Sequence, residues 1–259
     1  MKRLIACILL LVCLAPAALA ERLDDEVLLS YYDNSVIFGD SITEAFRRSR
    51  SAVRQTDDSF LDGTTVICVS SISLYAASRR FLSGEFHFSY RGSEKTMYQI
   101  TKEIKPERIF ILLGLNDPVG IKIDKAVVWV EDIITHMPEF SPDTEIYFFS
   151  ETPVTPGFCE WKGRPNYQEK INEYNVKLRE TCEAHGAHYV EIAEALKGED
   201  GYLNPVYSSD NRCHFSDEGV AVWIECMKDY AQEQSDLGLW DPFAAPEEPV
   251  ASGEAQEGA

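Results

Sequence analysis

The stretch Val36-Ile37-Phe38-Gly39-Asp40-Ser41-Ile42-Thr43 decides how this sequence folds and where its chemistry lies. Three consecutive apolar residues predict a short buried strand, and the helical pattern that follows predicts a strand-turn-helix unit. A serine at such a turn lies at the sheet edge, with its hydroxyl near the positive end of the helix. Ser41 is therefore a candidate nucleophile, although an ordinary serine N-cap has the same position in sequence.

Four more short apolar runs follow this strand, at 65–69, 108–113, 145–149 and 187–190. Their continuous apolar character predicts strands that are buried on both faces, as in a parallel sheet. Helical patterns lie between and after them, at 93–104, 125–137, 166–185 and beyond Ser216. The alternation predicts one α/β domain over residues 21–240, a doubly wound, mainly parallel five-stranded sheet with helices on both faces. Ligands of such domains bind beyond the carboxyl ends of the strands.

The two ends of the chain differ from this domain. Lys2 and Arg3, an apolar run at 4–14 and Ala18-Leu19-Ala20 predict a signal peptide at residues 1–20. We therefore expect the mature protein to be secreted or extracytoplasmic and not anchored in a membrane. Residues 241–259 are rich in Ala, Pro, Gly and Glu, which predicts a disordered acidic tail.

The composition argues against several partners. The formal net charge of −19 repels nucleic acid and anionic lipid, so neither is an expected partner. The sequence contains no Gly-rich phosphate loop, no dinucleotide fingerprint and no zinc-ligand spacing, so we expect neither cofactor nor metal. Five cysteines follow the signal peptide, and their pairing is left open: Cys68, Cys159, Cys182, Cys213 and Cys226.

Two other segments carry candidate catalytic residues. Gly114-Leu115-Asn116-Asp117 follows the third predicted strand, so Asn116 lies at the same sheet edge as Ser41 and its amide could donate to an oxyanion. An Asn-Asp pair is also common in simple turns. His214 precedes the last helix, in a loop that opens on the same edge, and an imidazole there could activate a serine.

The order of these three segments resembles the SGNH (GDSL-like) hydrolase family, over residues 36 to about 223. The resemblance implies that Ser41 attacks an ester carbonyl and that His214 acts as the base. It also implies an oxyanion hole formed by the Ser41 amide, a glycine amide after the second strand, and the Asn116 side chain.

The sequence departs from the family pattern in two places. No glycine follows the second strand, so Ser71, or alternatively Ser70, would supply the backbone amide of the oxyanion hole. The acid of the family stands three residues before the histidine, where this chain has Asn211. A bulge of one residue would let Asp210 reach the imidazole. The alternatives are orientation of the ring by Asn211 and a Ser-His dyad.

Other residues near these motifs are candidates for substrate binding. Asp117 adjoins Asn116. The loop after the fourth strand could supply an aromatic platform and two cations, from Phe158, Trp161, Lys162 and Arg164. The expected function is that of an exported serine esterase, which removes a small, acetyl-like acyl group from a carbohydrate or cell-envelope ester. Two alternatives stay open, an O-acyltransferase with the same site and a glycan-binding or scaffold protein on a degenerate hydrolase fold.

Overall fold

The computed structural model describes residues 22–82, 84, 86–117 and 123–244. The predicted signal peptide, residues 1–20, and most of the predicted tail, residues 245–259, lie outside the described residues. Within the described part of the chain, no helix combines the length and apolar character that a membrane span requires.

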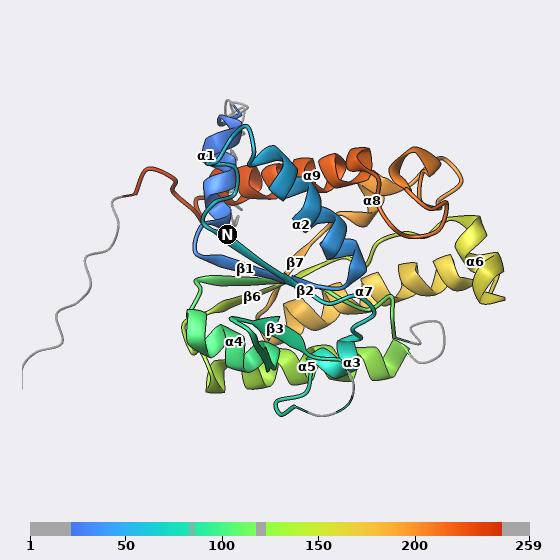
Figure 1. Ribbon diagram of the computed structural model, residues 1–259, viewed down its shortest axis with the longest axis horizontal. Coiled ribbons are helices and arrows are strands. Elements are labelled where there is room, and N and C mark those ends of the chain that lie inside the picture. The colour runs from blue at the N-terminus through green and yellow to red at the C-terminus, as the bar shows by residue number, and fades with distance from the viewer. Residues whose placement is uncertain (1–21, 83, 85, 118–122, 245–259) are drawn as a thin grey trace, which may run out of the picture.

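A central sheet of five parallel strands confirms the predicted fold class (Figure 1). Its order is β2-β1-β5-β6-β7, and every neighbouring pair is parallel. Each strand coincides with one of the five predicted apolar runs. The bounds are Ser35–Gly39 for β1, Thr64–Cys68 for β2, Arg108–Leu112 for β5, Glu145–Phe149 for β6 and His188–Val190 for β7.

Helices cover both faces of the sheet (Figure 1). On one face lie α1 (Asp25–Leu29), α2 (Ser41–Val53) and α9 (Asp217–Asp236), and on the other lie α4 (Met97–Ile104), α5 (Ile123–His136) and α7 (Tyr167–His185). Alternate strand residues enter two separate cores, with Ile37 in the first and Val36 and Phe38 in the second. The continuous apolar runs therefore reflect burial on both faces.

The segment after residue 84 differs from the prediction of a helix beginning at Ser93. Strands β3 (Phe88–Tyr90) and β4 (Ser93–Lys95) form an antiparallel hairpin, and the helix begins only at Met97. Thr96 ends the hairpin because it forms a capping box with Gln99, which fixes the helix start. The remaining elements are short: α3 (Leu74–Ala77), α6 (Pro156–Lys162), α8 (Ala193–Leu196) and the 3₁₀ turns η1 (Ser30–Tyr32), η2 (Met137–Glu139) and η3 (Pro205–Tyr207).

The order of the strands reverses at β1 and β5, which places a topological switch point between them. The loops after these two strands carry Ser41 and Asn116. In doubly wound sheets the crevice at this point is the usual ligand site. The sheet thus brings the first two candidate segments together.

Candidate active site

The turn after β1 is shaped around Gly39 and Asp40. A Cβ atom on Gly39 would lie 1.8 Å from Thr43 Oγ1 and 3.1 Å from the Leu112 carbonyl oxygen, so a larger residue does not fit between β5 and the first turn of α2. Asp40 is the N-cap of α2, and its Oδ1 accepts a hydrogen bond of 2.9 Å from the Ile42 amide. Ser41 is thereby fixed as the first residue of the helix.

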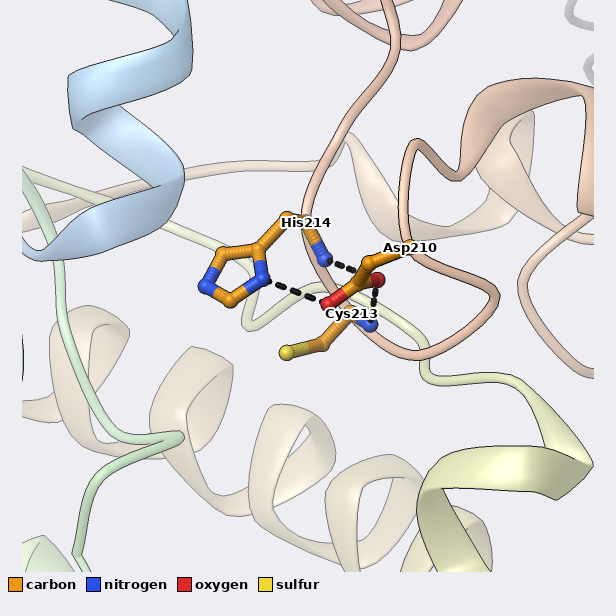
Figure 2. Close-up of side chains that lie close together, drawn as sticks. All are labelled: Asp210, Cys213 and His214. Carbon is orange, nitrogen blue, oxygen red and sulfur yellow. Dashed lines mark hydrogen bonds and ion pairs between the residues drawn. The ribbon is translucent and has the colours of Figure 1, made fainter.

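A chain of hydrogen bonds connects Ser41 with His214 and Asp210. His214 Nε2 lies 3.1 Å from Ser41 Oγ, and its Nδ1 lies 2.7 Å from Asp210 Oδ2. Figure 2 shows the imidazole with its Nδ1 directed toward the Asp210 carboxylate. A neutral imidazole that donates from Nδ1 can accept the serine proton at Nε2, and the carboxylate would stabilise the charged ring that results.

The loop before His214 has the one-residue bulge that the sequence left as one of several alternatives. Asn211 adopts a left-handed conformation with φ 53°, and the carboxylate of Asp210, one residue earlier, contacts the imidazole. Asp210 Oδ1 also accepts hydrogen bonds from the amides of Arg212 and Cys213, at 2.9 and 3.1 Å. Burial alone would raise the pKa of Asp210, but the hydrogen bonds from His214 and the Arg212 amide outweigh it, so this pKa is lowered.

Thr155 ties this loop to the start of α6. Its amide donates to the Arg212 carbonyl oxygen at 2.8 Å, and its hydroxyl donates to the Asn211 carbonyl oxygen at 2.6 Å. Gly157 packs so closely that a Cβ there would lie 2.9 Å from the Asn211 oxygen. Sequence reasoning did not identify Thr155, although Thr155-Pro156 is a recognisable helix start. Thr155 contacts Asn211 and Arg212, which lie more than 50 residues later in the chain, and no sequence pattern predicts such a contact.

The other side of the site contains the candidate oxyanion donors. Ser71 adopts φ 65°, the left-handed region that glycine favours, and so it occupies a glycine-like conformation in the loop after β2. Asn116 Nδ2 donates 2.6 Å to Asp40 Oδ2 and lies 3.3 Å from the Ile72 carbonyl oxygen. The bond to Asp40 is the shorter of the two, so the amide proton in the longer contact is the one that an oxyanion could recruit.

Asp40 therefore links the two sides of the site, a role that the sequence analysis did not assign. One carboxylate oxygen caps the helix that begins with Ser41, and the other accepts from Asn116. Burial raises the pKa of Asp40 to about 6, although the Ile42 amide and the nearby His214 oppose that rise. A preference of helix N-caps for aspartate is the signal that could have identified it.

Glu151 packs against Gly114, where an added Cβ atom would lie 2.8 Å from Glu151 Oε2. Its Oε1 accepts from the Thr152 amide at 2.9 Å, while its buried Oε2 has no hydrogen-bond partner among the described residues. Burial and the neighbouring Asp40 carboxylate raise the pKa of Glu151 to about 8, so this carboxyl group is largely protonated at neutral pH. Residues 151–154 follow β6 at this edge of the sheet, and all four are buried.

The three candidate substrate-binding residues are not gathered at one place. Asp117 is buried, and its carboxylate accepts hydrogen bonds from the amides of Leu74 and Tyr75, at 2.5 and 3.1 Å. It thus holds the start of α3, and those amides engage both of its oxygens, which argues against the expected substrate contact. Trp161 lies exposed on α6, and Arg164 follows the left-handed Gly163 that ends this helix.

Asp210, Cys213 and His214 are close enough in space to resemble a metal-ligand group (Figure 2). The carboxylate of Asp210 is already engaged by the imidazole and by backbone amides. Burial raises the pKa of the Cys213 thiol to about 12, which leaves it protonated and a poor ligand. The chemistry of these groups therefore fits a hydrogen-bonded pair of Asp and His better than a metal site. All five cysteines of the described chain are unpaired thiols.

A doubly wound sheet that brings a serine, a histidine and an acid together at its switch point has the architecture of an α/β hydrolase. The chain belongs to the GDSL-like Lipase/Acylhydrolase family, whose family model matches residues 37–222. Family membership identifies ester hydrolysis as the general chemistry of the chain. Among curated proteins, none matches it in sequence.

Solved structures share the fold at low sequence identity. A GDSL-like lipase from Bacteroides thetaiotaomicron VPI-5482 is 19% identical, with a TM-score of 0.57 over 77% of this chain and 87% of that chain. An acetylxylan esterase from Geobacillus stearothermophilus is 13% identical, with a TM-score of 0.52 over 82% of this chain and 96% of that chain. A further acetyl xylan esterase, AlAXEase, is 15% identical, with a TM-score of 0.52 over 76% and 98%.

Proposed function

We propose that this protein is an exported serine esterase, which removes a small acyl group of acetyl size from a carbohydrate or cell-envelope ester. The observation that carries the proposal is the continuous hydrogen-bond chain from Ser41 through His214 to Asp210. The apolar leader supports export, and the acetylxylan esterases among the structures of this fold motivate the choice of an acetyl ester.

In the proposed first half-reaction, Ser41 Oγ attacks the ester carbonyl carbon while His214 Nε2 takes the hydroxyl proton. The negative charge that develops on the carbonyl oxygen is stabilised by the Ser41 amide, the Ser71 amide and Asn116 Nδ2. Collapse of the tetrahedral intermediate breaks the bond to the alcohol, and His214 returns the proton to that leaving oxygen. The products are an alcohol and an acyl-serine.

In the second half-reaction, His214 takes a proton from water as the water oxygen attacks the acyl-serine. The second tetrahedral intermediate uses the same donors. Its collapse breaks the bond between the acyl carbon and Ser41 Oγ, His214 returns the proton to that oxygen, and the carboxylic acid leaves. The His214 side chain is 43% exposed, so water has direct access to the base. A sugar hydroxyl in place of water would make the same site an acyltransferase, which product analysis with an added acceptor separates.

Turnover of 4-nitrophenyl acetate by the purified protein tests the mechanism. Ser41→Ala should lower kcat by about 10⁴-fold or more, because nucleophile and base act as a unit. Ser51→Ala is the matched control, since Ser51 is exposed on the same helix and bonds only the Arg47 carbonyl oxygen. Unchanged turnover by a folded Ser41→Ala protein would exclude the mechanism.

A further inference from the structure

Trp161, Lys162 and Arg212 form a cationic aromatic surface beside the candidate active site, here called the α6 cation face. Trp161 is 56% exposed. Lys162 Nζ lies 4.4 Å and Arg212 Cζ lies 4.7 Å from the centroid of its ring. Lys162 is adjacent to Trp161 on α6, whereas Arg212 comes from the loop that carries Asp210 and His214. Two segments that are far apart in sequence therefore build this face.

The α6 cation face is fixed relative to the catalytic loop. The Arg212 amide donates to Asp210, and its carbonyl oxygen accepts from Thr155, the N-cap of α6. Arg212 is also two residues from His214, so their Cα atoms are at most about 7 Å apart. A single substrate molecule can therefore place its ester at Ser41 and another of its groups on this face.

The two cationic side chains of the α6 cation face have no ion-pair partner among residues 22–82, 84, 86–117 and 123–244. Neither Lys162 nor Arg212 forms an ion pair in the part of the chain that the structure describes, although acidic residues outnumber basic ones 43 to 24. Two cations against one ring repel each other, and the ring offsets only part of this cost. A bound anion would lower the electrostatic energy of the pair.

We propose that the α6 cation face binds a sugar carboxylate of the substrate, so that the preferred substrates are acyl esters of acidic, uronate-type sugars. This inference rests on the proposed esterase function and specifies its substrate class. The planar guanidinium of Arg212 matches a carboxylate in a two-point contact, and Lys162 adds a point charge. The open part of the Trp161 ring offers an apolar surface to the sugar. In a strongly acidic protein, such a local cationic site also selects which anions approach.

Binding to the Ser41→Ala protein tests the proposal without turnover. Three ligands differ only at C6: an acetylated methyl glucoside, the matching glucuronide and the matching 6-phosphate. We expect the glucuronide to bind at least about tenfold more tightly than the glucoside at low salt. Lys162→Glu should remove most of that preference and leave glucoside affinity unchanged, whereas Trp161→Ala should weaken the binding of both ligands, because either sugar would contact the ring. Lys125→Glu is the control, because Lys125 is exposed on α5 and the substitution changes net charge equally.

Each outcome decides the proposal. Equal or undetectable binding of glucoside and glucuronide would overturn it, and so would an equal effect of Lys125→Glu and Lys162→Glu, which would indicate net charge alone. Tighter binding of the 6-phosphate than of the glucuronide would overturn the carboxylate assignment. Turnover of neutral 4-nitrophenyl acetate separates this inference from the mechanism, because Lys162→Glu should not change it. If the wild-type protein turns over 4-nitrophenyl acetate but the Ser41→Ala protein, with Lys162 and Trp161 intact, shows no preference for the glucuronide, the α6 cation face alone is rejected.

Discussion

The two sides of the candidate site, here called the base side and the oxyanion side after their proposed roles, are built in different ways. On the base side, Ser41, His214 and Asp210 bond one another directly. On the oxyanion side, Asn116 is positioned by the buried carboxylate of Asp40, with Glu151 packed against Gly114. The base side thus depends on one surface loop, whereas the oxyanion side depends on ionisable groups in the protein interior.

Each side also contains a left-handed residue other than glycine. Asn211, on the base side, has φ 53°, and Ser71, on the oxyanion side, has φ 65°. Asparagine adopts this conformation at small cost, whereas serine has no such preference. The comparison indicates that the left-handed turn at Asn211 suits its residue, while the loop at Ser71 has a glycine-like geometry with a residue that strains it.

The largest expected effect is on the base side, at Asp210. Asp210→Ala should lower kcat by about 10³- to 10⁴-fold, because the imidazole loses both its orientation and the charge that stabilises its protonated form. Asn211→Gly should change kcat by less than about threefold, since glycine accepts the left-handed conformation. Steady-state kinetics of both variants provide the measurement. Equal losses of kcat in Asp210→Ala and Asn211→Gly would mean that the Asp210 carboxylate does not assist His214.

The next effect is on the oxyanion side, at Asn116. Asn116→Ala should lower kcat by about 10²- to 10³-fold with little change in KM, because the amide would act on charge that exists only in the transition state. The split between kcat and KM separates this role from substrate binding. A higher KM with unchanged kcat would instead place Asn116 in the binding of the ground state.

The buried acids predict a pH dependence of stability. The pKa of Glu151 rises from its ordinary value near 4.5 to about 8 in the fold, so between these pH values the folded state holds a proton that the unfolded state has lost. The free energy of unfolding should therefore fall as pH rises through this window. Glu151→Gln, which cannot titrate, should gain in melting temperature relative to the wild type between pH 5 and 8. If the difference in melting temperature between Glu151→Gln and the wild type stayed constant from pH 5 to 8, Glu151 would not be a buried neutral carboxyl group.

The smallest effect is expected from relief of the strain at Ser71. Ser71→Gly should raise the free energy of unfolding by up to about 1 kcal/mol, because glycine adopts a positive φ without the clash of a Cβ atom. Ser70→Gly is the matched control and should destabilise slightly, since Ser70 is not among the left-handed residues. Denaturant titrations of both variants provide the comparison. Destabilisation by Ser71→Gly would show that the serine side chain contributes to the loop.

The sequence predicts those parts of the structure that depend on a local pattern of residues. The five strands follow from apolar runs, and the sheet edge shared by Ser41 and Asn116 follows from parallel topology. The bulge at Asn211 was one of several possibilities, because spacing alone does not fix a backbone angle. Sequence could not show that Asp117 faces the amides at the start of α3, or that Thr155 holds the catalytic loop. Both contacts join segments more than 40 residues apart.

The central claim is that His214 activates Ser41 to attack an acyl carbon. Labelling with a fluorophosphonate probe, followed by peptide mass spectrometry, tests it most directly, because the probe reacts with serines whose proton an adjacent base removes. We predict one adduct per chain, on Ser41, and its loss in His214→Ala. A folded protein that takes up no label, or that carries it on another serine, would contradict the account.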